Sequence, residues 1–449
     1  MIPTRALRDC LDGAIPGVVS TWSADGTPNV AYMSQGQYVD RQHLALSYQF
    51  FNRTRQNILA NPRVTLGLIH PQTAQQYRVH LTYQRTETEG PLFESMKAKL
   101  AGIASHTGMS GVFRLLGADL YRIDRVEAVP GTTLPLPAPA VDPLSALRAC
   151  MERLPLSHDT ESLLDALLDG LVEHFDIRHT LVMMLDPARE RLYTVASRGY
   201  ETSGVGSELQ VGEGVIGVAA RERVPIRISH MTSEYAYGLA MREGAQRQGL
   251  GGLVDTEIPF PGLAAPGSQL AVPIPGPREP LGVLFVESPT DMRFSHAEED
   301  ALVALAAQVG ALFRLFLAEL ELGEEAVAPA EGEPGPSGPP MRVRHYAAND
   351  SVFLGDDYLI KGVAGNILWT LLQDHQASGR TQFSNRELRA DPRVRLPDQS
   401  DNLEARLVLL HRRLAERQAC VQLEKTGRGR FRLRVDCPLE MEDMAPGSV

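Results

Sequence analysis

Apolar and polar positions along the chain follow different patterns in three successive stretches. The first stretch shows short runs of β-branched and aromatic residues separated by turn residues, which predicts a β-rich segment. Asp25 and Gly26 form a favourable hairpin turn within its first run. A short helix is expected over Gln56–Ala60, because Asn61 and Pro62 end it. A hairpin is predicted at 17–33, and strands are predicted at 64–69, 77–85 and 112–123.

The middle stretch combines helical and strand periods. Leucines three and four positions apart over Leu163–Phe175 predict an amphipathic helix, and a longer apolar helix is expected over Ala297–Leu320. The Pro-Gly-Pro turn at 275–277 favours antiparallel pairing of the strands on either side. These patterns indicate helices packed on an antiparallel sheet. Strands are predicted at 180–185, 191–197, 269–274 and 281–287.

The last stretch predicts a hairpin, three helices and a second hairpin. Ser384, followed three residues later by Glu387, forms a capping box that begins the short middle helix. The turn of the second hairpin lies at Thr426–Gly429. The remaining elements are expected at 351–361 (hairpin), 363–375 and 403–418 (helices), and 421–425 and 430–435 (strands).

Two segments of low complexity separate these stretches. Residues 130–140 are rich in proline. Residues 323–340 combine glutamate, glycine and proline without a hydrophobic period, which predicts disorder. The predicted fold class is multidomain α+β. We expect a first domain at 1–131, a second at 142–322, a disordered linker at 323–340 and a third domain at 341–440.

Composition and charge narrow the class of protein. The 449 residues are 43% hydrophobic and 22% charged, as in globular domains, with a formal net charge of −11. Residues 341–436 hold 17 basic and 12 acidic residues, so this stretch is positive and the rest of the chain is strongly negative. This asymmetry favours a polyanion as partner of the last domain, with chance clustering as the alternative. Finding neither a secretory leader nor an apolar run of about 18 residues, we expect a cytoplasmic protein that does not enter a membrane.

The cysteines and the potential catalytic groups suggest no reactive centre. Cys10, Cys150, Cys420 and Cys437 lack the spacing of metal ligands and are expected to be small buried or half-buried thiols. No Ser/His/Asp, paired-carboxylate or metal-ligand set stands at meaningful spacing. We therefore predict no catalytic residue and no metal ligand.

One motif of the first domain stands out for its chemistry. An aromatic strand runs into Arg53, Thr54 and Arg55 at the start of a helix, where free backbone N–H groups and guanidinium forks suit an anion. A solvated basic turn is the alternative. The order of strands around this motif, with Asn-Pro-Arg-Val after the helix, resembles the FMN-binding split barrel of the pyridoxamine 5′-phosphate oxidase superfamily over about residues 1–130.

The resemblance implies a flavin site in which the basic turn holds the phosphate. Relatives also bind deazaflavin or haem, which rank below FMN here, or have lost the cofactor. The further basic residues that phosphopyridoxamine oxidation needs are not found, so ordinary vitamin B6 synthesis is not expected. Carried over to this chain, the FMN site comprises Arg53, Thr54, Arg55, Gln56, Ser47 and Tyr48.

The second domain resembles a GAF domain. Leu209–Gly217, Leu270–Ile274, Pro280–Val286 and Arg293–Asp300 stand at that family's usual places. The G-x-G-x-x-G string within the first motif would otherwise suggest a dinucleotide loop, but no βαβ unit surrounds it. No cysteine lies between Cys150 and Cys420, which excludes covalent bilin attachment inside this domain. The candidate pocket residues, which could instead pack a lid against the sheet, are His230, Tyr235, Tyr237, Met241 and Phe260.

The third domain resembles the winged-helix output domain of two-component response regulators. In that family the third helix enters the major groove and the wing reaches a neighbouring part of the DNA. Val408 and Leu409 replace a hydroxyl and an arginine of the usual pattern, which leaves room for a helix that binds protein instead. The implied DNA contacts are Arg406, Arg412, Arg413 and Arg417 of the helix and Lys425, Arg428, Arg430 and Arg432 of the wing.

Together these expectations indicate a cytoplasmic one-component sensor and transcriptional regulator that couples binding of a flavin or another small molecule to DNA binding. One alternative is a flavin-dependent oxidoreductase with accessory domains. Another is a scaffold without a ligand. Apolar stripes on the helices at 144–175 and 297–320 predict a homodimer, with a purely intramolecular core as the alternative.

Overall fold

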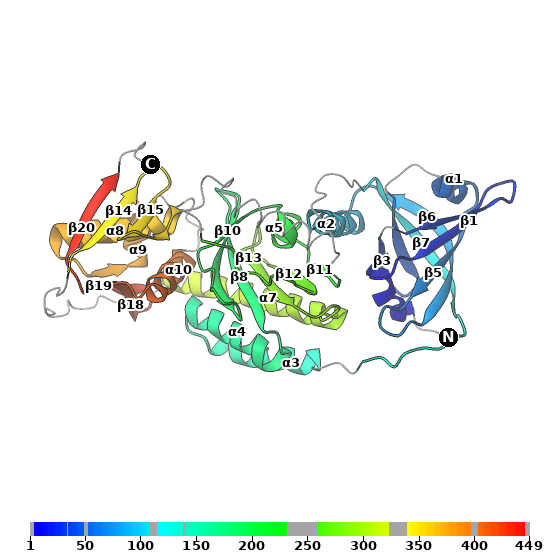
Figure 1. Ribbon diagram of the computed structural model, residues 1–449, viewed down its shortest axis with the longest axis horizontal. Coiled ribbons are helices and arrows are strands. Elements are labelled where there is room, and N and C mark those ends of the chain that lie inside the picture. Colours follow the sequence, from blue (N-terminus) through cyan, green and yellow to red (C-terminus); the bar gives the residue numbers. More distant parts are fainter. Residues whose placement is uncertain are drawn as a thin grey trace.

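The part of the chain that the structure describes forms four sheets with helices packed on them, so this is a multidomain α+β protein (Figure 1). The three predicted stretches follow one another along the longest axis, with the seven-stranded sheet at one end and the C-terminal sheets at the other. The computed structural model describes residues 4–33, 35–48, 53–106, 115–137, 141–230, 258–322, 339–394, 396 and 403–444.

The N-terminal domain is a curled antiparallel sheet with the strand order β2-β1-β5-β6-β7-β4-β3. Alternate side chains such as Leu44, Leu66 and Val79 are buried, because successive residues of a strand point to opposite faces. Helix α1 begins at Arg53, where strand β4 has ended. The elements are η1 Thr4–Leu7, η2 Asp9–Leu11, β1 Val18–Trp22, β2 Pro28–Tyr32, β3 Gly36–Tyr38, β4 His43–Tyr48, α1 Arg53–Ala60, β5 Arg63–Ile69, β6 Gln76–Glu87, α2 Pro91–His106 and β7 Gly117–Ala128.

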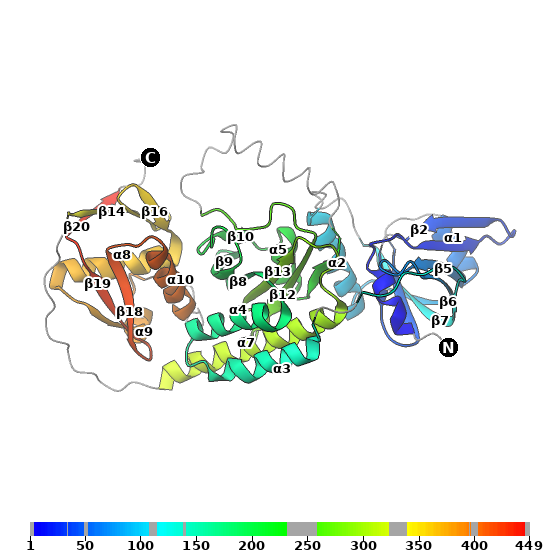
Figure 2. The ribbon, with the colours of Figure 1, turned by 60° about the horizontal axis from the view of Figure 1, so that its bottom comes forward.

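Helix α2 joins the first two domains. Met96 and Leu100 lie in a buried cluster with the N-terminal sheet, whereas Ala98 belongs to a buried cluster of the middle domain. Figures 1 and 2 place α2 beside α5 (Gly214–Glu222), with which it is in contact. The small side chain of Ala98 permits this close approach between helices.

The middle domain is an antiparallel sheet of order β10-β9-β8-β13-β12-β11 between two helical layers. Val182 and Met184 belong to the cluster shared with α4 and α7, whereas Leu181 and Met183 belong to the cluster shared with α5. Figure 2 shows α3, α4 and α7 along one side of the sheet. The elements are α3 Pro143–Arg153, η3 Leu154–Leu156, α4 Thr160–Phe175, β8 His179–Asp186, β9 Arg191–Arg198, β10 Glu208–Gln210, α5 Gly214–Glu222, β11 Ile226–Ile228, β12 Ser268–Ile274, β13 Gly282–Ser288 and α7 His296–Leu322.

Helix α7 corrects the expectation that the chain has no apolar run of about 18 residues. The part His296–Ala318 is long and apolar enough to cross a membrane by length and composition, with a mean hydropathy of 2.0 in its most apolar window. Half of that window is buried, and Leu305, Val309 and Phe313 are fully covered in a core shared with α3 and α4. Core packing therefore accounts for the apolar stripe, as the intramolecular alternative expects, and the homodimer stays a prediction.

The C-terminal domain contains the two hairpins and three helices expected from the sequence, together with three strands, at 341–346, 382–384 and 439–444, that the sequence pattern does not predict. The capping box is confirmed: Glu387 N–H donates to Ser384 Oγ at 3.3 Å, and Ser384 N–H donates to Glu387 Oε2 at 3.0 Å. One sheet has the order β16-β15-β14-β20, with β20 parallel to β14, and the other has the order β17-β19-β18. The elements are β14 Met341–Tyr346, β15 Ser351–Leu354, β16 Asp357–Ile360, α8 Gly362–Ser378, β17 Gln382–Ser384, α9 Asn385–Ala390, α10 Leu403–Glu416, β18 Val421–Gly427, β19 Arg430–Val435 and β20 Leu439–Met444.

Two of the four cysteines are paired, which corrects the expectation of free thiols. Cys420 precedes β18 and Cys437 follows β19, and the antiparallel pairing of these strands brings the cysteines together in a disulfide. The register of the hairpin decides this contact, and sequence spacing does not show it. Cys10 and Cys150 are buried free thiols, as expected.

Candidate functional site

The basic turn of the N-terminal domain contains one buried arginine. Arg55 Nη1 donates to both carboxylate oxygens of Asp119 at 2.7 Å, and Nη2 donates to Thr86 Oγ1 at 2.6 Å. The side chain of Arg55 is 11% exposed and that of Asp119 is 6% exposed. Burial alone would lower the pKa of Arg55, but the Asp119 carboxylate raises it. Arg55 is therefore neutralised inside the fold, which argues against the phosphate contact expected from the sequence.

The other predicted residues of this turn lie differently. Arg53, at the first position of α1, is exposed and forms no ion pair with another residue that the structure describes. Thr54 Oγ1 accepts a hydrogen bond from Asn29 Nδ2 at 2.9 Å. The Tyr48 ring lies 4.7 Å from the guanidinium of Arg55, so this ring packs on the buried ion pair. Arg53 and the N-terminal amides of α1 thus remain for an anion.

Two buried side-chain oxygens beside strand β4 are a feature that the sequence pattern does not predict. The side-chain oxygens of Gln35 and Gln37 are buried and have no hydrogen-bond donor within the described ranges. The backbone oxygen of Gln35 accepts from the N–H of Ser47 at 3.0 Å, which places this residue beside the end of β4. Buried acceptors without a donor suit a ligand that carries N–H groups, as a flavin ring does. Arg53 and Gln56 are exposed on α1, and their side chains carry donors that fit a flavin phosphate.

The pocket predicted for the middle domain is not supported by the residues that can be placed. His230 is exposed and pairs with Asp291 at 3.3 Å, and Phe260 is 40% exposed. The other three predicted residues, Tyr235, Tyr237 and Met241, lie outside the described residues.

A buried carboxylate of the middle domain was not predicted. Glu287, in β13, is 2% exposed and accepts hydrogen bonds from Gln269 Nε2 at 3.0 Å and from the N–H of Leu263 at 2.9 Å. Burial raises its pKa, and these donors only partly offset that effect. Because Glu287 alternates with Phe285, it lies on the same face of the sheet as α5. The signal in the sequence was a single glutamate that ends an otherwise apolar strand.

Comparisons with known families identify the first two domains. Residues 3–117 match the pyridoxamine 5′-phosphate oxidase family model, and residues 157–314 match the GAF domain model. The chain thus carries a pyridoxamine 5′-phosphate oxidase-like domain followed by a GAF domain. A search of curated proteins finds no match. The first domain is called the oxidase-like domain from here on.

Solved structures resemble the two domains separately. The GAF domain of an Acinetobacter phosphoenolpyruvate-protein phosphotransferase is 23% identical, with 39% of this chain and 94% of that chain covered and a TM-score of 0.30. An FMN-binding protein of Syntrophomonas wolfei is 15% identical (29% and 89% covered, TM-score 0.24). Group A Streptococcus HupZ is 22% identical (30% and 100% covered, TM-score 0.24). At these identities the likeness concerns the fold alone.

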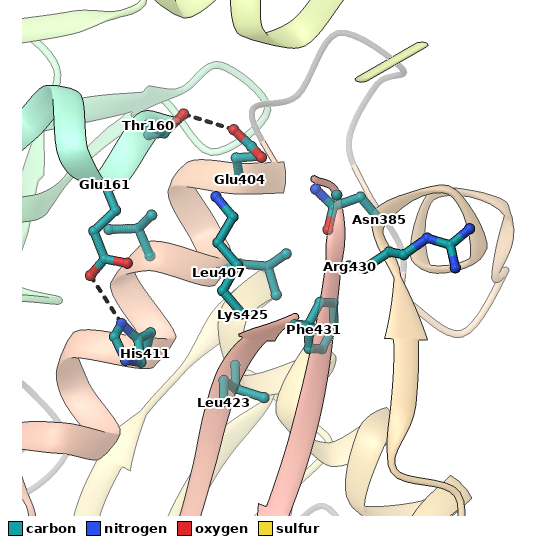
Figure 3. Close-up of a pocket in the computed structure, with 12 residues that line it drawn as sticks. Thr160, Glu161, Asn385, Glu404, Leu407, His411, Leu423, Lys425, Arg430 and Phe431 are labelled. Carbon is teal, nitrogen blue, oxygen red and sulfur yellow. Dashed lines mark hydrogen bonds and ion pairs between the residues drawn. The ribbon is translucent and has the colours of Figure 1, made fainter. Parts of the chain in front are cut away.

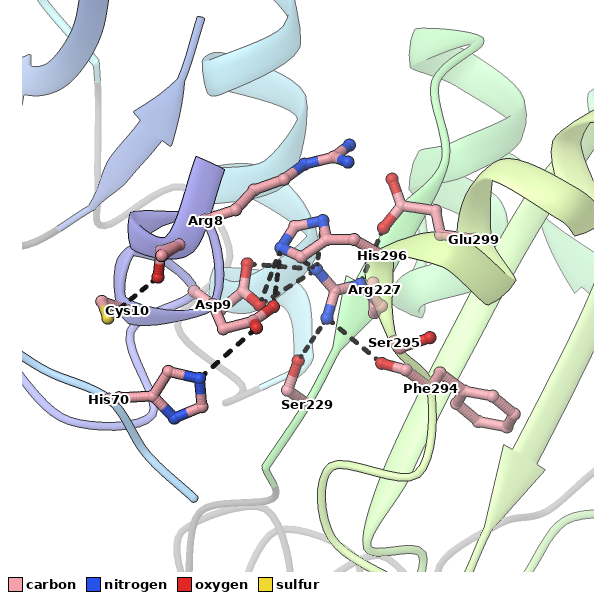
Figure 4. A network of polar contacts seen from close by, with 12 residues as sticks. Arg8, Asp9, Cys10, His70, Arg227, Ser229, Phe294, Ser295, His296 and Glu299 are labelled. Atoms are coloured by element: carbon pink, nitrogen blue, oxygen red, sulfur yellow. Dashed lines mark hydrogen bonds and ion pairs between the residues drawn. The ribbon is translucent and has the colours of Figure 1, made fainter. Parts of the chain in front are cut away.

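A buried ion-pair network connects the oxidase-like domain to the GAF domain (Figure 4). Arg227 of β11 is 7% exposed and binds Asp12 at 3.0 Å and Glu299 at 2.7 Å. Burial alone would raise the pKa of Asp12, but His296 and Arg227 lower it. Asp9, Asp12 and His296 approach one another closely enough to hold a metal ion. Arg227 Nη2 lies 2.9 Å from the ring nitrogens of His296, so a guanidinium already supplies the cation here.

The GAF domain also binds the C-terminal domain through α10. Arg406 Nη2 donates to Asp186 Oδ2 at 2.8 Å, and the two side chains are 5% and 3% exposed. The guanidinium also lies 4.0 Å from the centre of the Tyr193 ring. Buried residues of α10 and of the GAF helical layer belong to one continuous apolar cluster. The predicted DNA-reading helix is therefore covered by another domain in this structure.

Further polar contacts involve Thr160, Glu161, Glu404, His411 and Lys425, which line a cavity between the start of α4 and the hairpin β18–β19. Figure 3 shows two of these contacts from close by, Thr160 with Glu404 and Glu161 with His411. All of them join the GAF domain to the C-terminal domain. The contacts are Arg412 to Asp165 at 2.7 Å, His411 to Glu161 at 3.0 Å, Lys425 to Asp159 at 2.5 Å and Thr160 to Glu404 at 2.9 Å.

The other residues predicted to bind DNA are placed within the C-terminal domain or at its surface. Arg413 is buried and donates to the backbone oxygen of Leu359 at 2.9 Å. Arg432 pairs with Glu424 on the neighbouring strand. Arg417 and Arg428 are exposed, and Arg430 is half-buried beside the cavity.

The departure from the response-regulator pattern has a physical reason. Val408 and Leu409 are 8% and 3% exposed. A methyl group added to Gly206 of the GAF domain would lie 3.6 Å from a Leu409 methyl carbon, so Leu409 packs against that glycine. Apolar side chains stand here because this part of α10 contacts protein.

The His411–Glu161 pair predicts that the docking of α10 depends on pH. Its hydrogen bond raises the pKa of His411 and lowers that of Glu161. Because the pKa of His411 is raised in the folded state, the pair stabilises the fold fully below the unfolded-state pKa of histidine. This stabilisation is lost as the pH rises through the folded-state pKa. Between about pH 6 and about pH 8.5 we expect a loss of less than about 1 kcal/mol, because the pair is half-exposed.

The measurement is the denaturant midpoint of the C-terminal domain at both pH values. His411→Gln should abolish most of the pH dependence. His43→Gln is the control, because His43 pairs with Asp40 within the oxidase-like domain. An equal pH dependence in wild type and His411→Gln would rule out this pair as the cause.

Proposed function

We propose that this chain is a ligand-responsive regulator with three connected parts. The oxidase-like domain binds a flavin, the GAF domain senses a small molecule, and the C-terminal domain acts on DNA as a winged helix. The observation that carries the proposal is the continuity of buried contacts, with Arg227–Asp12 at one junction and Arg406–Asp186 at the other. Rigid contacts of this kind can transmit a change in one domain to the next.

The flavin site rests on exposed Arg53 and on the buried side-chain oxygens of Gln35 and Gln37. Arg53 would neutralise the phosphate together with the amides that begin α1. Gln35 and Gln37 would accept hydrogen bonds from ring N–H groups. FMN, when bound, supplies the redox chemistry itself, and these residues bind and orient it.

Arg53→Ala should weaken FMN binding about tenfold to a hundredfold, because a charged hydrogen bond to phosphate contributes roughly 1.5–3 kcal/mol. Quenching of FMN fluorescence measures the dissociation constant. Arg63→Ala, which removes an exposed arginine just beyond α1, should leave it unchanged. Absence of FMN binding by the wild type at micromolar concentration would contradict the flavin site.

The DNA part of the proposal rests on the excess of basic over acidic residues at 341–436, 17 against 12, and on the three helices followed by a hairpin in the C-terminal domain. It is tested by fluorescence anisotropy of a labelled duplex titrated with the full chain at several salt concentrations. Phosphate contacts predict a logarithm of affinity that falls with the logarithm of salt, by about 0.9 for each contact. No duplex binding at low salt would favour a role in protein interaction only.

A second candidate function is flavin-dependent oxidoreduction. The match of residues 3–117 to the oxidase family model favours it. Oxidation of NADH or NADPH by the FMN-loaded chain, at rates above those of free FMN, would support this function. No turnover with either nicotinamide would favour a sensory use of the flavin.

A further inference from the structure

The GAF surface beneath α10 is acidic. Its carboxylates form ion pairs with cationic side chains of the C-terminal domain that DNA phosphates would otherwise bind. Glu161 and Asp165 lie four residues apart on one face of α4, and Asp159 caps the start of that helix. Asp186 ends β8 at the buried centre of the contact. We name these four carboxylates the acidic latch. Their partners are Lys425 for Asp159, His411 for Glu161, Arg412 for Asp165 and Arg406 for Asp186.

We propose that the acidic latch substitutes for DNA phosphates and holds the C-terminal domain in a closed state that excludes DNA. This inference rests on the proposed function. Arg406, Arg412 and Lys425 cannot bind a carboxylate of the latch and a phosphate at the same time. The closed and the DNA-bound states therefore compete, and anything that weakens the latch raises the affinity for DNA.

The apolar part of the contact adds a steric reason. Val408 and Leu409 lie at the middle of α10, and both are covered. Leu410 and Leu414 of the same helix are also buried, and α10 contacts α8 and β18 of the C-terminal domain as well as α4 and β9 of the GAF domain. With protein on both sides, α10 can reach a major groove only after the two domains separate.

The test weakens the latch from the GAF side, so that every predicted DNA contact stays intact. The variant is Glu161→Gln with Asp165→Asn, whose side chains are 31% and 52% exposed and can be changed without opening a core. The control is Asp169→Asn with Glu173→Gln on the same helix, which removes the same charge. Asp169 and Glu173 contact Arg153 and Arg198 of the GAF domain.

Two measurements are made on each full-length protein. Hydrogen exchange of residues 403–416 reports release of α10. Anisotropy of a labelled mixed-sequence duplex of about 25 base pairs, at about 50 mM salt, reports DNA binding. The latch variant should exchange faster and bind the duplex about tenfold more tightly than the wild type, whereas the control should match the wild type in both.

The results distinguish failure of the acidic latch from failure of DNA binding, the proposed function on which the latch rests. Faster exchange in the latch variant with unchanged duplex affinity would overturn the latch and leave DNA binding in place. Faster exchange with no duplex binding by any protein would overturn the DNA-binding function itself. An equal gain in the control would show that charge alone, and no opening, changes the affinity.

A cross-linked protein tests the closed state directly, so the proposal can be tested even if the latch variant does not open. The hydroxyl of Ser203 donates to the carboxylate of Glu416 across the contact. Cysteines introduced as Ser203→Cys and Glu416→Cys can be joined by a short bismaleimide, because Cys10 and Cys150 are buried. Cross-linking should reduce duplex affinity at least tenfold relative to each single cysteine variant treated in the same way. Full affinity of the cross-linked protein would overturn the closed state as a barrier to DNA.

Discussion

Replacing Arg406 by alanine is expected to lower the free energy of unfolding by about 3–5 kcal/mol, because it leaves the carboxylate of Asp186 buried without its guanidinium. Asp186 is 3% exposed, so water cannot replace the lost partner without opening the contact between the domains. The same change removes the guanidinium from the Tyr193 ring. The loss should therefore appear both as destabilisation and as release of α10 from the GAF domain.

Denaturant unfolding followed by circular dichroism measures the stability, and hydrogen exchange locates the loss. Arg412→Ala is a matched control on the same helix, because its partner Asp165 is 52% exposed and such pairs contribute about 1 kcal/mol or less. The double variant Arg406→Met with Asp186→Leu should recover much of the stability, since it leaves no unpaired buried charge. Equal effects of Arg406→Ala and Arg412→Ala would contradict the buried character of the first pair.

The second large effect is expected at Arg55. Arg55→Ala should destabilise the oxidase-like domain by about 3–5 kcal/mol, because Asp119 would remain buried without its guanidinium. Thr86 also loses a donor, and the rings of Tyr48 and Tyr83 lose the cation between them. Any loss of flavin affinity would then follow from unfolding of the site.

Unfolding of the variant in denaturant, with and without FMN, distinguishes this structural role from a phosphate contact. Arg85→Ala is the control, because Arg85 is 63% exposed and pairs with nearby Glu87. A variant Arg55→Ala with wild-type stability and no FMN binding would restore the role predicted from the sequence and contradict the structure.

Local sequence was sufficient for most of the elements, because they depend on near neighbours. The hairpin at Asp25-Gly26, the capping box of Ser384 and Glu387, and the apolar runs of β8 and β13 depend on residues close to one another. The same information placed Arg53 at the junction before a helix expected to begin at Gln56, whereas α1 begins at Arg53 itself.

Only the tertiary structure decided which charged side chains are available to bind a ligand or DNA. Arg55 meets Asp119 across 64 residues of sequence, and Arg406 meets Asp186 across 220. No local pattern distinguishes such an arginine from one that faces solvent, because burial and pairing depend on how the sheets curl and how the domains dock. The sequence by itself determined most of the elements, the family resemblances of the first two domains and the basic character of α10. The tertiary structure decided that α10 turns this basic face toward the carboxylates of its own GAF domain, where low exposure strengthens the pairing of Arg406 with Asp186.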